Sequence, residues 1–509
     1  MNILFKRSVQ RIILLAISFL IQVAIIIFFL LQYSEYFFNF YIASLALSIV
    51  IVFIITNSKS NPSYKIAWII PVMIFPVFGG LFYLLYGGNK LSAREKLKMA
   101  IQNIEMTHSL KQNDKIMQKL QEDNIYAKNQ SEYILNYAKC PVYNNTETTY
   151  FKIGEEKFEA LLKELKKAKK FIFLEYFIIQ EGKMFNSILE ILEEKVKQGV
   201  DVRVIYDDVG CIITLPHNYQ KKLEAKGIKC KVFNPVKPLF TRRLNNRDHR
   251  KIVVIDGDVG FTGGINLADE YINEYEKHGY WKDAAIMLKG DAVWNLTIMF
   301  LSMWDYIDNR EEDYMRFKPS KYKYYNTNGY VQPFDDSPLI NEPIGETVYL
   351  NLINKAKDYI YINTPYLIID NEMATALKIA SKSGIDIKIV TPYIPDKKFV
   401  HAVTKSYYES FIKDGIEIYE FIPGFMHAKT FVVDDEYAVV GSINLDFRSL
   451  YLHYECGVWL YKTDSISDIK KDYLDTLKKC HKVTMAECKN TSVIRKFGRL
   501  IIRMFAPLL

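Results

Sequence analysis

The stretch Phe171-Ile-Phe-Leu-Glu-Tyr-Phe-Ile-Ile179 has the composition of a buried strand, and Tyr359-Ile-Tyr-Ile-Asn-Thr-Pro-Tyr-Leu-Ile-Ile369 repeats that pattern later in the chain. A helical stretch precedes each run, and another helix follows it. Then come a glycine and a second apolar strand, Gly199-Val-Asp-Val-Arg-Val-Ile205 in one copy and Gly384-Ile-Asp-Ile-Lys-Ile-Val390 in the other. The chain after about residue 140 is therefore predicted to contain two copies of one structural unit.

The order of elements within each copy predicts the fold class. A further helix ends at Gly227 or Gly415, and a third strand follows it. Strands that alternate with helices are typical of an α/β sandwich with a mixed or largely parallel sheet. The predicted organisation is a membrane anchor at 1–95, a linker at 96–139, a first α/β half at 140–310, a Lys- and Tyr-rich connector at 311–327, a second half at 328–490 and a basic amphipathic C-terminal tail at 491–509.

Each copy carries the same polar signature after its third strand. The first is His249-Arg-Lys251-Ile-Val-Val-Ile-Asp256, continuing to Gly263-Gly264-Ile-Asn266. The second is His427-Ala-Lys429-Thr-Phe-Val-Val-Asp434, continuing to Gly441-Ser442-Ile-Asn444. The spacing from His to Lys, Asp and Asn is the same in both. A lone histidine is usually structural, but two of the eight histidines fall on matching positions here, which favours shared chemistry.

This spacing places a nucleophile beside a cation. On an extended strand, a His and a Lys two residues apart point to the same face. Small residues in the turn before the Asn let a ligand approach the backbone closely. If the copies face each other across a pseudo-two-fold axis, both sets surround one anion. We therefore predict a phosphate site in which one His attacks phosphorus, the other acts as acid and base, and four side chains bind the phosphate oxygens: Lys251, Lys429, Asn266 and Asn444.

Carboxylates complete the predicted site. Each catalytic histidine needs an acceptor for its second ring nitrogen. Asp283 and Glu455 are the candidates, because each precedes an apolar run where an unpaired carboxylate is costly. A strand-edge charge that faces water is the alternative. Asp256 and Asp434 belong to the catalytic signature, but each ends an apolar strand before a turn, which favours a structural role.

The first ninety residues are nearly all apolar and predict a multi-pass anchor in the cell membrane. Ile12 to Leu31, Phe37 to Ile55 and Ile66 to Tyr86 are each about 20 residues long, enough to cross about 30 Å of hydrocarbon as a helix. A removable signal peptide is a poor alternative, because no cleavage site follows the first run. The third run contains two prolines and two glycines, so it either spans or dips into the bilayer. The flanking basic residues leave the sidedness of the active site open.

The remaining composition adds two expectations. The six cysteines lack CxxC spacing and are predicted to be free thiols; no metal-ligand cluster stands out, so no metal or cofactor is expected. In the tail, Val493, Phe497, Leu500 and Met504 recur at helical spacing with arginines on another face. This pattern predicts a helix on an anionic membrane surface, with a terminal helix packed on the domain as the alternative.

The doubled HxKxxxxD signature with its trailing GGxN or GSxN resembles the HKD motifs of the phospholipase D superfamily, over residues from about 140 to 490. Within that superfamily the chain is similar to bacterial cardiolipin synthases, through its apolar N-terminal region, Tyr206-Asp-Asp-Val-Gly210, Asn444-Leu-Asp-Phe-Arg448-Ser449 and the closing Ala506-Pro-Leu-Leu509. Three apolar runs, where two clear spans would suffice, are a departure.

The resemblance implies two phospholipase D-like α/β halves packed as one catalytic unit. It also implies transfer of a phosphatidyl group between two phosphatidylglycerol molecules, giving cardiolipin and glycerol through a covalent phosphohistidine and without a metal. His249 would be the nucleophile and His427 the acid and base, although the symmetry of the sequence permits the reverse.

Phosphatidylglycerol and anionic membrane lipids are therefore the expected partners. A membrane phospholipase D, or a phosphatidyltransferase with another alcohol acceptor, would use the same residues. A lipid alcohol outcompetes water if the pocket is dry and at the bilayer. A nuclease would need a basic groove and no spans, so no nucleic-acid partner is expected. A binding protein without catalytic activity would be expected to have decayed motifs, whereas both copies of the signature are intact here. The oligomeric state is not predicted.

Overall fold

The computed structural model describes residues 37–75, 93–236, 245–308, 312–320, 323–340 and 342–508, together with a few isolated positions before residue 88. The first predicted membrane run, Ile12 to Leu31, lies almost entirely outside these residues, and Ile66 to Tyr86 is described in part.

The first half is a seven-stranded mixed sheet in the order β1-β8-β6-β5-β2-β3-β4. Its neighbours β2, β3 and β4 run parallel, and the remaining pairs are antiparallel. The strands are β1 (Thr146–Phe151), β2 (Phe171–Tyr176), β3 (Asp201–Asp207), β4 (Lys229–Phe233), β5 (Lys251–Ile255), β6 (Val259–Gly263) and β8 (Ala285–Gly290). Its helices are α8 (Gly154–Leu165), α9 (Lys183–Lys197), α10 (Asp208–Cys211) and α11 (Tyr219–Glu224), with a 3-10 turn η2 (Asp269–Ile272).

The second half repeats this sheet and adds one strand, in the order β19-β13-β12-β10-β15-β16-β18-β9. The strands are β9 (Tyr330–Asp336), β10 (Tyr359–Asn363), β12 (Asp386–Pro392), β13 (Glu417–Phe421), β15 (Thr430–Val433), β16 (Tyr437–Gly441), β18 (Glu455–Tyr461) and β19 (Cys480–Lys482). The helices are α13 (Ile344–Lys355), α14 (Asn371–Lys382), α15 (Lys398–Lys413), α16 (Phe447–Tyr451) and α17 (Ser465–Leu477). Read from β9, the order matches that of the first half from β1, so the predicted pair of α/β halves is confirmed.

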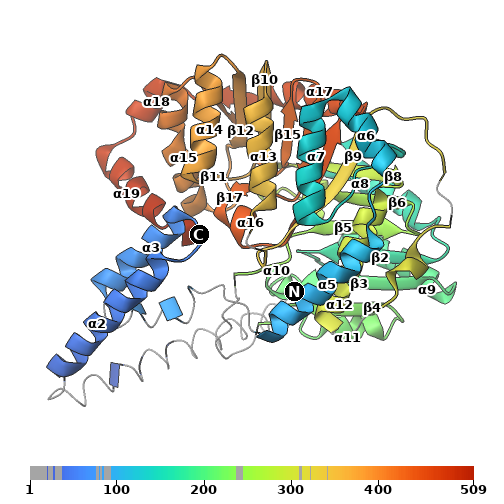
Figure 1. The fold of residues 1–509 in the computed structure, drawn as a ribbon, viewed down its shortest axis with the longest axis horizontal. Helices are drawn as coiled ribbons and strands as arrows, with labels where there is room; N and C mark the ends of the chain where they lie inside the picture. Colours follow the sequence, from blue (N-terminus) through green and yellow to red (C-terminus); the bar gives the residue numbers. More distant parts are fainter. Residues whose placement is uncertain are drawn as a thin grey trace.

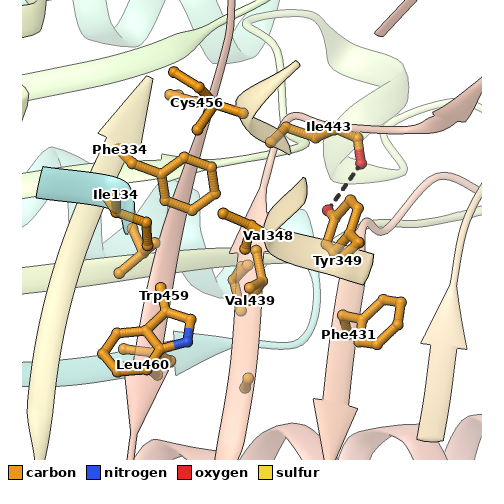
Figure 2. Close-up of a cluster of buried hydrophobic side chains, with 14 of the residues drawn as sticks. Ile134, Phe334, Val348, Tyr349, Phe431, Val439, Ile443, Cys456, Trp459 and Leu460 are labelled. Carbon is orange, nitrogen blue, oxygen red and sulfur yellow. Dashed lines mark hydrogen bonds between the residues drawn. The ribbon is translucent and has the colours of Figure 1, made fainter. Parts of the chain in front are cut away.

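The two halves share one core. In Figure 1 the first half (green) and the second half (orange to red) lie against each other, and strands β6 and β8 of one contact β16 and β18 of the other. Helix α12 (Val293–Asp308) is buried from Val293 to Trp304, because its side chains are apolar nearly all round and it packs between β5 and β9. Figure 2 shows part of the core around β16 and β18, where the Tyr349 hydroxyl donates to the Ile443 carbonyl at 3.3 Å.

Residues 96–139, predicted as a linker, carry three helices that pack on this core. They are α5 (Ala93–Ser109), α6 (Asp114–Asp123) and α7 (Ile125–Ala138). Helix α7 contacts α13 and β9, with Ala127 and Ile134 buried, and the Trp294 indole donates to the Ser109 carbonyl at 3.0 Å. The segment differs from a linker because apolar side chains such as Leu120, Ala127 and Ile134 are buried in the core.

The remaining elements lie around the junction and at the two ends. Two short parallel pairs join β7 (Tyr280–Lys282) to β14 (Gly424–Met426) and β11 (Leu367–Ile368) to β17 (Leu445–Asp446); the connector holds η3 (Tyr314–Phe317). Helices α2 (Phe37–Thr56) and α3 (Pro62–Ile74) project away from the sheets in Figure 1, and α3 contacts α19 (Val493–Met504) and η4 (Ala506–Leu508), which follow α18 (Met485–Lys489). Within the described residues, no helix is found that is both long enough and apolar enough to cross a membrane.

Candidate active site

The two signature histidines lie at the junction of the halves, each just before a central strand. The His249 backbone N–H donates to the Tyr454 carbonyl at 2.9 Å, beside an isolated parallel bridge between Asp248 and Tyr454. The His427 N–H donates to the Lys282 carbonyl at 2.7 Å, where β14 pairs with β7. Each histidine is therefore bonded through its backbone to a segment of the opposite half.

These segments bring the two candidate carboxylates to the histidines in a crossed arrangement. His249 Nδ1 lies 2.9 and 3.0 Å from the two oxygens of Glu455, and His427 Nδ1 lies 2.6 Å from Asp283 Oδ2. Glu455 belongs to the second half and Asp283 to the first. Because Nδ1 is occupied in both rings, Nε2 is the nitrogen left for a ligand. The sequence predicted both carboxylates as hydrogen-bond acceptors for the histidines, but it did not predict which histidine each would contact.

The electrostatics of the site keep the rings neutral and the carboxylates charged. Burial lowers the pKa of His249 to about 3 and that of His427 to about 4. Burial alone raises the pKa of Glu455, but the neighbouring His249 outweighs it and holds the pKa well below its usual range. In the same way, burial raises the pKa of Asp283, but the neighbouring His427 outweighs it and lowers that pKa. Each ring therefore presents a lone pair at Nε2, with an Nδ1–H that donates to a carboxylate.

The two signature lysines are buried beside the histidines without a counter-ion. Each is 2% exposed, and each ammonium donates to the backbone carbonyl of its own histidine. Burial lowers the pKa of Lys251 to about 8 and that of Lys429 to about 7. Across the ranges that the structure describes, neither lysine forms an ion pair with a carboxylate. Asp283 and Glu455 are close enough to raise the pKa of both lysines, but neither carboxylate forms an ion pair with them, which leaves the two ammonium groups available to an anionic ligand.

The two signature asparagines are not equivalent. Asn266 Nδ2 donates to the Tyr271 hydroxyl at 2.7 Å, and its Oδ1 accepts from the Ile178 N–H at 3.0 Å. Asn444 is equally buried, but its Oδ1 has no hydrogen-bond partner in the described part of the chain. Both amide atoms of Asn266 are thus bonded within the protein, whereas the side-chain oxygen of Asn444 is not.

The aspartates of the two signatures lie away from the histidines, at the far ends of their strands. The Asp256 carboxylate accepts from three consecutive backbone N–H groups, those of Lys169, Lys170 and Phe171, at 2.7–2.9 Å. Asp434 does the same for residues 357–359. Both have φ near +54° and end a strand in a tight turn. This geometry is that of residues which fix the start of the adjacent strand, as the apolar pattern indicated.

Two polar residues join the site that sequence reasoning missed. The Ser442 hydroxyl donates to Glu455. The His453 ring lies 5.6 Å from that of His249, where Trp281 lies 5.2 Å from His427 in the other half. The signal was present, since His453 and Trp281 each stand two residues before a carboxylate and so share its face. Among the described residues, His249, His453 and Glu455 form a group whose metal-ligating atoms lie within 4.8 Å of one another.

The buried residues that pack next to the two signatures also differ between the halves. Arg250 is fully buried between Glu175, at 2.5 Å, and Asp248, at 3.1 Å. At the corresponding positions the second half has Ala428 and Asn363, whose amide donates to Thr430 at 2.9 Å. One signature therefore rests on buried ion pairs, and the other on neutral hydrogen bonds.

Comparison with known proteins gives matches over both halves. A family described as cardiolipin synthase, phospholipase D-like domain, matches residues 161–289 and again residues 349–477, and one described as phospholipase D-nuclease N-terminal matches residues 45–88. A cardiolipin synthase of Alkalihalophilus pseudofirmus is 34% identical over 426 residues, covering 82% of this chain and 84% of the relative. One from Geobacillus thermodenitrificans is 35% identical over 434 residues, covering 83% and 84%.

Two further matches give less information about function. A Streptococcus mutans protein described only as uncharacterized is 46% identical over 456 residues, covering 89% of this chain and 98% of that protein. The crystal structure of a Haemophilus influenzae phosphatidylserine synthase superposes with a TM-score of 0.55 at 14% identity, covering 75% of this chain and 100% of the other. At that identity the likeness bears on the fold alone.

Proposed function

The chain belongs to the cardiolipin synthase family with two phospholipase D-like domains, and from this premise we propose that it transfers a phosphatidyl group from one phosphatidylglycerol to another, giving cardiolipin and glycerol. The observation that carries the proposal is the pair of buried, neutral histidines, each held by a carboxylate of the opposite half, next to two buried lysines that form no ion pair within the described residues. This arrangement suits one phosphodiester placed between two ring nitrogens.

In the first step, His249 Nε2 attacks the phosphorus of phosphatidylglycerol. A P–N bond forms, and the bond between phosphorus and the headgroup glycerol oxygen breaks. His427 gives its proton to that oxygen, and glycerol leaves. The bound phosphodiester favours the charged form of His427, because a nearby anion raises the pKa of an imidazole above its value in the empty site.

In the second step, His427 takes the proton from the glycerol hydroxyl of a second phosphatidylglycerol. That oxygen attacks phosphorus, the P–N bond breaks, and His249 returns to its neutral state. Lys251, Lys429 and the Nδ2 amide group of Asn444 donate hydrogen bonds to the non-bridging oxygens as charge develops. We assign the nucleophile to His249 because Glu455 meets its ring with both oxygens, which stabilises the positive ring of a phosphohistidine.

We also propose that the protein is a multi-pass protein of the cell membrane, with α2, α3 and the preceding apolar run as its anchor. The match of the N-terminal family to residues 45–88 supports this placement, as do exposed apolar side chains on α2 such as Ile42, Val50 and Phe53. The tail helix α19 packs on α15, where Arg503 lies over the Tyr407 ring at 4.1 Å, and leaves Phe497 exposed toward the lipid surface that we propose.

A product assay tests the function. Purified full-length protein is mixed with phosphatidylglycerol in detergent micelles, without nucleotide or added metal, and the lipids are resolved by mass spectrometry. We expect cardiolipin and one glycerol for each cardiolipin formed. Phosphatidic acid as the only lipid product would make water the acceptor and the protein a hydrolase. No product at all would refute phosphatidylglycerol as the donor.

A further inference from the structure

His453 lies at the nucleophile but has no task in the transfer reaction. Its side chain is 11% exposed, and its Nδ1 lies 3.8 Å from Glu455 Oε1. Within the described residues neither ring nitrogen has a hydrogen-bond partner. A buried imidazole with both nitrogens unsatisfied is costly, so the position needs an explanation.

The surroundings of His453 supply the donor set of a zinc site. Two imidazoles and one carboxylate are the ligands of many catalytic zinc centres, in which zinc lies about 2.0–2.2 Å from each ligand atom. Neighbouring ligand atoms in such a tetrahedron are about 3.3 Å apart. Here the His249 Nδ1–Glu455 distance is 2.9 Å and the His453 Nδ1–Glu455 distance is 3.8 Å, values that bracket this spacing.

Among its described residues, the other half lacks this donor set. His427 and Asp283 match His249 and Glu455, but Trp281 occupies the place of His453, and an indole does not ligate metals. The second half therefore serves as an internal control, because its histidine–carboxylate pair provides two candidate metal ligands where the first half provides three.

We propose that His249, His453 and Glu455 bind one divalent cation of the zinc type, and that its binding inhibits phosphatidyl transfer. Zinc replaces the Nδ1 proton of His249, which is released to solvent, and takes the Glu455 oxygen from its hydrogen bond. The ring then faces a dication where it had a carboxylate. A positively charged phosphohistidine is destabilised there, so Nε2 becomes a poorer nucleophile. The inhibitory part of this inference rests on the proposed function, and the binding part does not.

Calorimetric titration of chelator-treated full-length protein with zinc chloride tests the binding directly. We expect one site per chain in the unaltered protein. His453→Gln keeps a side chain of similar size, and His453→Trp installs the residue of the other half; both should weaken binding by more than about tenfold, because one of three ligands is lost. The exposed His217→Asn is the matched control and should bind as the unaltered protein does.

The same titration is then followed by cardiolipin production from phosphatidylglycerol micelles. Zinc should inhibit the unaltered protein at least about tenfold at saturation, and EDTA should restore its rate. Each His453 variant, compared with its own zinc-free rate, should need more than about tenfold more zinc. Zinc binding of equal strength in the His453 variants, or none in an unaltered protein that makes cardiolipin, would overturn the inference. Zinc binding by a protein that makes no cardiolipin would instead refute the function and leave the site in place.

Discussion

The two halves of the catalytic unit place the same groups at the junction but support them differently. Beneath His249 lies a chain of buried charges, with Arg250 held between Glu175 and Asp248. Beneath His427 the counterparts are neutral, and Asn363 bonds to Thr430. Histidine, lysine and carboxylate nevertheless occupy matching positions. The comparison teaches that the repeat preserves the spacing of the reacting groups, whereas the scaffold under each has diverged.

The largest effect should come from the histidines themselves. His249→Ala and His427→Ala are each expected to lower the rate of cardiolipin formation by about 10⁴-fold or more, because each removes a group that forms or breaks a bond. The halves should differ in what accumulates. His427→Ala retains the nucleophile, so mass spectrometry of the intact protein should detect a phosphatidyl adduct that His249→Ala lacks. An adduct on the His249→Ala variant would reverse the assignment.

The crossed carboxylates should produce the next largest effect. Glu455→Gln and Asp283→Asn keep the shape of each side chain but lose the acceptor that fixes the ring, and a loss of about 10³-fold is expected in each. Because the pairs cross, the second-half variant Glu455→Gln should disturb the nucleophile His249, and Asp283→Asn should disturb His427, which acts as acid in adduct formation and as base in its discharge. Rapid-quench measurement should therefore show slowed formation in both variants and slowed discharge in Asp283→Asn; unimpaired formation in Glu455→Gln would contradict the pairing.

The lowered pKa values of the two lysines predict that kcat/KM depends on pH. A lysine is charged below its pKa, so kcat/KM should fall as pH rises through about 7–8, where burial places the pKa values of Lys429 and Lys251. In the empty site burial lowers the pKa of His427 to about 4, so this residue adds no separate break to the profile near neutrality. Lys429→Met should cost about 10²-fold at pH 7. Lys429→Arg, which keeps its charge, should move the basic limb upward; an unchanged profile would assign that limb to another group.

The asparagines should give the smallest effects and the sharpest contrast. Asn266→Ala leaves the Ile178 N–H and the Tyr271 hydroxyl unpaired, so the free energy of unfolding should fall by about 1–3 kcal/mol. Asn444→Ala should leave stability nearly unchanged and lower kcat/KM about tenfold. Denaturant unfolding and steady-state kinetics on both variants test this. Equal stability losses would remove the distinction between the two halves at this position.

The sequence was informative where the chemistry depends on local spacing. The doubled signature identified both sets of His, Lys and Asn, and strand position identified Asp283 and Glu455 as carboxylates in need of a partner. The structure places these two within hydrogen-bond distance of the histidines. Their pairing was beyond the sequence, because it depends on the register in which one half docks on the other. The sequence places His453 on the same face as Glu455, two residues away, but its approach to His249 depends on the same docking register.

Other differences arose from packing that composition obscures. Residues 96–139 look polar enough for a linker, but part of their apolar side chains, among them Leu120, Ala127 and Ile134, are buried in the core. The unequal asparagines depend on what stands five residues later, Tyr271 in one half and Ser449 in the other. A tyrosine reaches back to the amide, and a serine does not. Such differences depend on the length of neighbouring side chains and on their positions in the fold, which a matched sequence motif does not specify.

The crossing of the carboxylates has a consequence for how the protein is made. Translation delivers His249 and Lys251 long before Glu455, which stands near the end of the chain. A nascent first half therefore has a nucleophile whose ring is not yet oriented and an anion site with one of its two lysines. On the proposed mechanism, we expect transfer to begin only after Glu455 has been synthesised and the second half has docked on the first. A first half made without the second lacks the carboxylate that orients His249 and is therefore expected not to attack membrane phospholipids.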